Sequence, residues 1–122
     1  MPTAVRFYRD KLGFEVVSTS PQLGGDPDRF HWCLLRLGDA ELMLNDVYEF
    51  DHERPSREEH QRARGHRDMC LYFGCPDVEA AYEELTAKGV KVSAPKVAPY
   101  GMKQMYLKDP DGFGICFQWK AE

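Results

Sequence analysis

The chain of 122 residues contains the same pattern of elements twice, and this repetition constrains the fold more than any other feature. The first copy, PTAVRFYRDKLGFEVVS, begins at Pro2, and the second, PDVEAAYEELTAKGVKVSA, begins at Pro76. Each copy opens with a proline and a helix-capping residue and continues with apolar residues at helical spacing. Each then reaches a glycine, Gly13 or Gly89, that suits the end of a helix. An alternating strand is predicted directly after each helix, over 14–18 and 90–94.

The repetition extends through two further strands in each half. LRLGDAELMLN and YLKDPDGFGICFQ are both typical of a strand, a glycine turn and a second strand. A strand is also predicted over 68–74, before the second helix, and the first half has no residues for a matching strand before Thr3. We therefore expect the chain to lack the first strand of its own repeat, and the sequence leaves open whether Met1 is the true start.

The repeat divides the chain into two modules, which we interpret as one domain over 1–122. Module 1 covers about 1–47, a charged linker covers about 48–67, and module 2 covers about 68–122. A short helix is predicted in the linker over 56–64. The linker is interpreted as a solvated connection, with a lid or a dimer contact as the functional alternative.

Composition limits the class of partner. Apolar residues make up 43% of the chain and charged residues 30%, with a net charge of −4 and no basic run, which argues against a nucleic-acid partner. No apolar run is long enough for a membrane span, and no signal peptide is visible. The four cysteines are widely spaced and form no CxxC motif. We therefore expect a cytoplasmic protein with reduced thiols and no membrane partner.

These motifs resemble the vicinal oxygen chelate superfamily, which includes glyoxalase I, extradiol dioxygenases, fosfomycin-modifying enzymes and bleomycin-resistance proteins. The resemblance is carried by AVRFYRDKLGFEV, LRLGDAELML, CPDVEAAYEELTAKGVKV and APYGMKQMYLKDPDGFGICF, which together cover nearly the whole chain. It implies an α+β fold in which two βαβββ modules form a cupped mixed sheet, with the helices outside and a small ligand inside. It also implies a homodimer, and an unpaired sheet edge would favour dimerisation or strand exchange.

The resemblance also locates the residues that would hold a metal ion. In the metal enzymes of the superfamily, His and Glu ligands project from the first and last strands of each module. The three positions that can be assigned here carry Met43, Cys70 and Cys116, and the fourth would lie on the missing strand. Thioether and thiol groups are poor ligands for a hard cation. The resemblance therefore argues against glyoxalase or dioxygenase activity, and no catalytic residue is assigned.

The two cysteines leave several interpretations open. They are most simply small apolar lining of a pocket, but two facing thiols could also bind a soft ion, form a disulfide or react as thiolates. Strand alternation places them on the same face as Tyr72 and Gln118. The expected ligand pocket consists of Met43, Asn45, Cys70, Tyr72, Tyr100, Cys116 and Gln118. Tyr100 is included because the resemblance places an aromatic residue at the mouth of the pocket.

The sequence therefore favours a protein that binds a small organic ligand by sequestration or carriage, close to the metal-free bleomycin-resistance branch and without a cofactor. The alternative is a metal-dependent lyase or dioxygenase of the same superfamily, for which a divalent metal would be the cofactor. A third interpretation is an incomplete chain whose site lacks its first strand. The sequence does not indicate which ligand is bound.

Overall fold

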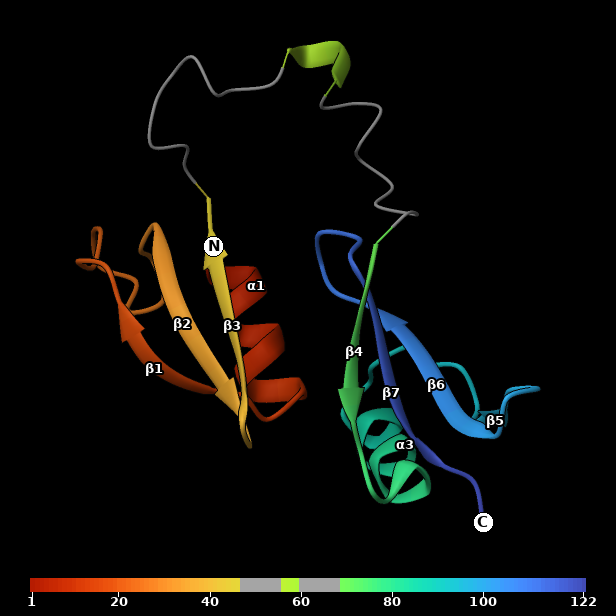
Figure 1. Cartoon of the computed structure of the whole chain (residues 1–122). Helices are drawn as coiled ribbons and strands as arrows, with labels where there is room; N and C mark the ends of the chain where they lie inside the picture. Colours follow the sequence, from red (N-terminus) through yellow and green to blue (C-terminus); the bar gives the residue numbers. More distant parts are fainter. Residues whose placement is uncertain (47–55, 60–68) are drawn as a thin grey trace. The chain divides into compact units, whose positions relative to one another are not determined.

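The computed structural model describes residues 1–46, 56–59 and 69–122, and its contacts divide the chain into two compact units, Met1–Arg64 and Gly65–Glu122. Each unit joins a helix to a β-sheet (Figure 1), which confirms the predicted α+β class. No helix within the described ranges is long and apolar enough to cross a membrane.

The predicted linker lies largely outside the described residues. In its described part, residues 57–59 are helical. The Ser56 amide donates to Glu59 Oε2 at 2.8 Å, and the Glu59 amide donates to Ser56 Oγ at 3.1 Å. This reciprocal pair is a capping box, which is typical of the first turn of a helix. The remainder of the helix predicted over 56–64 lies outside the described residues.

Unit 1 contains one helical segment and an antiparallel sheet of three strands in the order β1-β2-β3. Its elements are α1 (Pro2–Arg6), the π-helical turn η1 (Phe7–Lys11), β1 (Glu15–Thr19), β2 (Trp32–Leu37) and β3 (Ala40–Asn45). The helical segment packs against one face of the sheet, where the Tyr8, Cys33 and Leu35 side chains are fully buried. A helix followed by three strands was predicted, although the π-helical turn was not.

Unit 2 contains the complete βαβββ order. Its elements are β4 (Cys70–Gly74), α3 (Val78–Ala87), β5 (Lys96–Val97), β6 (Met102–Lys108) and β7 (Gly114–Lys120). The sheet order is β4-β7-β6-β5, with β4 parallel to β7 and the other pairs antiparallel. The strand predicted over 90–94 is reduced to an isolated bridge between Val92 and Leu107. Pro95, which has no amide hydrogen to donate, interrupts the ladder before β5.

Helix α3 determines which face of this sheet is covered. The Asp77 carboxylate accepts the Ala80 amide at 3.0 Å and caps the helix, as its position in the repeat predicted. Lys103 of β6 donates to Glu79 of α3 at 3.1 Å, so odd-numbered residues of β6 face the helix. Ile115 and Phe117 of β7 share that face and are buried. The even-numbered residues of β6 and β7 therefore point to the opposite side.

Candidate functional site

The candidate site is the face of the unit 2 sheet that points away from α3, which we call the open face. Its residues follow from strand alternation and from registers that run without a shift through β4, β7 and β6. The open face consists of Cys70, Tyr72, Gly74, Lys96, Met102, Gln104, Tyr106, Lys108, Gly114, Cys116, Gln118 and Lys120.

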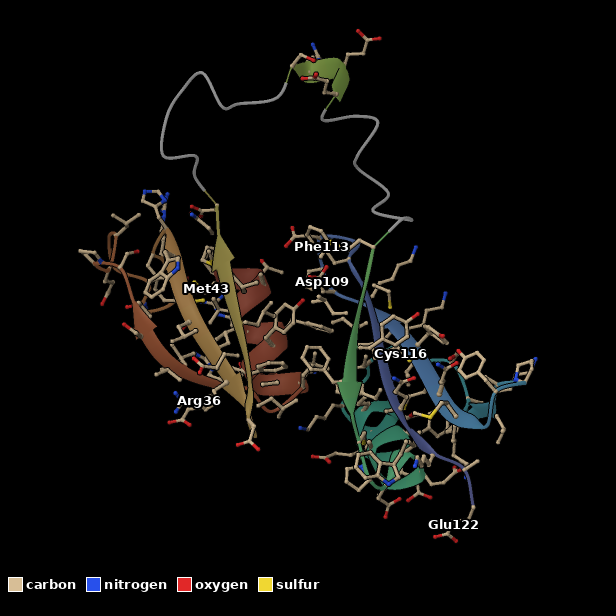
Figure 2. All side chains as sticks on the ribbon, viewed as in Figure 1. Arg36, Met43, Asp109, Phe113, Cys116 and Glu122 are labelled. Carbon is tan, nitrogen blue, oxygen red and sulfur yellow. The ribbon has the colours of Figure 1, made fainter. Side chains whose placement is uncertain are left out.

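The centre of the open face is a row of three side chains on adjacent strands. Tyr72, Cys116 and Tyr106 lie opposite one another on β4, β7 and β6, and Figure 2 labels Cys116, the central residue of the row. Tyr72 is 54% exposed and Tyr106 is 42% exposed, whereas Cys116 between them is completely buried. The row therefore presents two aromatic side chains to solvent and covers the thiol between them.

Burial raises the pKa of several titratable groups on the open face. Burial raises the pKa of the Cys116 thiol, although its hydrogen bond with Tyr106 partly opposes the shift. Desolvation raises the pKa of the Tyr106 hydroxyl, and the neighbouring Tyr72 and Cys116 add to the shift. Burial also raises the pKa of the Cys70 thiol. At neutral pH Cys70 and Cys116 are therefore thiols and the Tyr106 hydroxyl is protonated, so none of these three groups is an activated nucleophile.

A hydrogen-bonded amide pair forms the next row. Gln104 Nε2 donates to Gln118 Oε1 at 2.8 Å, and the Tyr106 hydroxyl donates to Gln104 Oε1 at 3.1 Å. The Tyr100 hydroxyl lies 3.0 Å from Gln104 Nε2 and 3.2 Å from Gln104 Oε1. Gln104 is 6% exposed, so its amide is a buried hub that fixes the position of the other three side chains.

The turn between β6 and β7 sets the register that brings these rows together. Asp109 Oδ1 accepts the amides of Asp111 and Phe113, each at 2.9 Å. Gly112 has φ +91°, a conformation that favours glycine. Asp109 lies in the turn before β7 (Figure 2). Because its carboxylate is buried and accepts backbone amides, it acts as a structural group that places Tyr106 opposite Cys116.

The structure brings together five of the seven residues predicted to line the pocket. Cys70, Tyr72, Cys116 and Gln118 lie on the open face, and the exposed Tyr100 reaches it through Gln104.

Met43 and Asn45 lie in the other unit, on β3. They share one face of the unit 1 sheet, opposite Leu34 and Trp32, and Met43 is 65% exposed. That all seven residues line one pocket remains a prediction.

Two central residues of the site, Gln104 and Tyr106, were not predicted. They alternate with buried residues in MKQMYLK, so strand periodicity could have placed them on one face. Their importance depends on the hydrogen bonds to Tyr100 and Gln118, for which the sequence contains no signal.

The metal centre implied by the resemblance does not fit the residues present. Its assignable positions carry a thioether at Met43 and two thiols, at Cys70 and Cys116, with raised pKa. A divalent ion with open positions for substrate is held by nitrogen and oxygen donors. Among the side chains that the structure describes, no group of three or more His, Cys, Asp or Glu could hold a metal ion.

Comparison with solved structures identifies similar proteins. TnmS3, an antibiotic binding protein from Streptomyces sp. CB03234, is 27% identical, with 98% of this chain and 85% of that chain covered and a TM-score of 0.65. A glyoxalase/bleomycin resistance protein from the same Streptomyces is 26% identical, with coverage of 96% and 89% and a TM-score of 0.60. A bleomycin-binding protein complexed with bleomycin is 18% identical, with coverage of 96% and 87% and a TM-score of 0.61, and so shares the fold.

Comparison of the sequence with curated proteins and with family profiles gives a match to a family profile. None of the curated proteins matches this chain. The profile of the Glyoxalase/Bleomycin resistance protein/Dioxygenase superfamily matches residues 1–117. The resemblance found in the sequence is thereby confirmed, and the chain belongs to the glyoxalase/bleomycin resistance protein/dioxygenase superfamily.

Proposed function

We propose that this protein binds a flat aromatic small molecule on the open face and acts by sequestration or carriage, making and breaking no bond. The observation that carries the proposal is the row in which exposed Tyr72 and Tyr106 flank the buried Cys116. The strands that carry the two tyrosines, β4 and β6, are two strand spacings apart, about 10 Å, and the two side chains interact with each other. Aromatic side chains fixed on a sheet offer a large apolar area at a small cost in conformational entropy.

The polar groups of the open face supply orientation. Ligand sites combine apolar walls with a few fixed polar groups. Here the buried Gln104 holds Gln118, Tyr100 and Tyr106 in place through hydrogen bonds of 2.8–3.2 Å. A site prepared in this way loses little freedom when a ligand binds.

The comparisons support binding over catalysis. TnmS3 is described as an antibiotic binding protein, and the bleomycin-binding protein was solved with bleomycin bound. The neutral state of Cys70, Cys116 and Tyr106 supports the same conclusion, because a nucleophile of this kind would need a lowered pKa. The proposal includes a homodimer in the reducing cytoplasm, as the resemblance implies, and sedimentation velocity of the purified protein would test the dimer.

A thermal-shift screen of aromatic compounds, antibiotics included, tests the proposal. A ligand that binds only the folded state raises the unfolding temperature. We expect at least one compound to do so, and we expect the shift to disappear in Tyr72→Ala/Tyr106→Ala. Tyr82→Ala is the matched control, since it removes a partly exposed tyrosine from α3. A screen without a shift, or a shift that survives in the double tyrosine variant, would refute the proposal.

Metal analysis separates the proposal from a metal-dependent lyase or dioxygenase. Elemental analysis of the purified protein is expected to find no stoichiometric Fe, Mn, Ni or Zn. A stoichiometric metal that is lost in Cys70→Ala or Cys116→Ala would contradict the proposal and favour the enzyme.

A further inference from the structure

The open face carries charges of one sign only. Lys96, Lys108 and Lys120 lie on it, each near the end of a strand, and all three are exposed. None of the residues that define this face is Asp or Glu. The chain as a whole has a net charge of −4, so the charge of the open face is opposite to that of the whole protein.

Three carboxylates of unit 2 are engaged elsewhere. Glu79 pairs with Lys103 on the α3 side of the sheet, and Glu84 pairs with Lys88 of the same helix. Asp109 is buried in its turn, where it accepts backbone amides. Within the described residues, no carboxylate forms an ion pair with Lys96, Lys108 or Lys120. Their positive charges therefore remain available to a ligand.

The amide network also directs hydrogen-bond donors outward. Gln118 Oε1 is occupied by Gln104 Nε2, so Gln118 keeps its own amide hydrogens for an external acceptor. Gln104 Oε1 is occupied by the Tyr106 hydroxyl. The raised pKa of Tyr106 keeps that hydroxyl protonated. Each bond of this network uses one donor and one acceptor, and the Gln118 amide hydrogens are the donors that remain for a ligand.

We infer that the ligand of the open face is an aromatic anion, a flat molecule that carries a carboxylate or another acidic group, rather than a cationic compound. This inference rests on the proposed function and specifies the ligand class of the same site. The two tyrosines contact the ring system, Gln118 donates to the acidic group, and the exposed lysines at the strand ends attract it by their charge. The acidity of the whole chain would by itself favour a cation, but short-range charges dominate because salt screens distant ones within about 10 Å.

Three anthracenes that carry a negative, a neutral or a positive substituent at the same ring position provide the test. Anthracene-9-carboxylate, anthracene-9-methanol and 9-(aminomethyl)anthracene share one ring system, and their fluorescence reports binding to the full-length protein. We expect the carboxylate to bind about tenfold more tightly than the amine, since each exposed charge contributes a modest Coulomb term. Its affinity is expected to fall as salt is added, whereas that of the alcohol should change little.

Variants locate the effect on the open face. Lys108→Gln is expected to weaken binding of the carboxylate several-fold without weakening that of the alcohol. Lys103→Gln is the matched control, because it removes the same charge from the same strand on the side that faces α3. Combining Lys96→Gln, Lys108→Gln and Lys120→Gln should abolish the preference for the carboxylate.

The outcomes separate this inference from the proposed function. Equal affinity for the three anthracenes, or a preference for the amine, overturns the inference while the proposed function stands. A charge preference that is unchanged in the triple lysine variant also overturns it. The absence of binding by all three overturns the inference, whereas the proposed function fails only when the broader screen yields no tyrosine-dependent ligand.

Discussion

Cys116 owes its properties to the tyrosines on either side of it. Its thiol is completely buried on the open face, between side chains that are themselves about half exposed. A carboxylate at this position would have oxygen donors for a metal and would need a partner for its charge. A neutral thiol needs no such partner, and Cys116 fills the space between Tyr72 and Tyr106.

Alkylation of the cysteines tests the orientation of this face at single-residue resolution. Cys70 and Cys75 are both half-buried with raised pKa, but Cys70 lies on the open face and Cys75 follows β4 with the opposite parity. A raised pKa lowers the thiolate fraction at neutral pH, so alkylation of both should be slow at pH 7 and accelerate as the pH rises. We expect anthracene-9-carboxylate to slow the alkylation of Cys70 and to leave Cys75 unchanged.

Mass spectrometry of the digested protein measures the two rates in one sample, so Cys75 serves as the internal control. Equal protection of both thiols, or protection of Cys75 alone, would show that the ligand occupies a different surface.

At the scale of elements, the turn between β6 and β7 positions the candidate site. Asp109→Ala removes the acceptor for two backbone amides and should destabilise the protein by about 1–3 kcal/mol. Asp109→Asn retains an oxygen acceptor and should lower the free energy of unfolding by less. Urea denaturation of the two variants measures which of them is less stable. Equal losses of stability would show that the side-chain acceptor does not stabilise the turn.

A second element-scale prediction concerns the ion pairs that join the helical segment of unit 1 to the loop before β2. Arg9 and Arg6 donate to the Asp28 carboxylate at 2.7–3.1 Å, and these bonds lower its pKa below the ordinary value of 3.8. A lowered pKa in the folded state contributes stability above about pH 4, and this stability is lost as the pH falls through the folded pKa.

The variant Asp28→Asn should therefore have a free energy of unfolding about 1–2 kcal/mol lower at pH 7, a modest loss because the arginines are partly exposed. The difference in free energy of unfolding between the variant and the unmodified protein should shrink toward pH 2. Glu83→Gln on the exposed side of α3 makes the same formal charge change and should show no such trend. Urea denaturation across this pH range measures the effect, and a difference that stays constant with pH would contradict the role of Asp28.

Sequence reasoning predicted most elements because their signals are local. The capping Asp77, the helical spacing and the glycine turns each act within a few residues, and the structure places a helix or a strand accordingly. The strand expected over 90–94 failed because Pro95 interrupts its ladder. Gln104 was missed because its role depends on partners distant in sequence, such as Gln118. Lys96, Lys108 and Lys120 were missed for the same reason, because they share one face of the sheet only once β5, β6 and β7 are paired in register.

At the scale of the whole molecule, the two units contain similar elements but differ in the number of strands that the structure describes. The described part of unit 1 contains a helical segment and three strands, whereas unit 2 contains the full βαβββ order. The parallel strand β4 adds Cys70 and Tyr72 to the open face of unit 2. The complete unit therefore carries the aromatic row and the amide pair within one sheet.

An NMR titration of the uniformly labelled protein with anthracene-9-carboxylate tests the central claim most directly. Ring currents shift the amide signals of residues near a bound aromatic molecule, so the affected residues locate the ligand. The account predicts the largest shifts at Tyr72, Tyr106 and Gln118, with little change in α3. The absence of shifts, or shifts concentrated in α3 and the odd-numbered residues of β7, would contradict it.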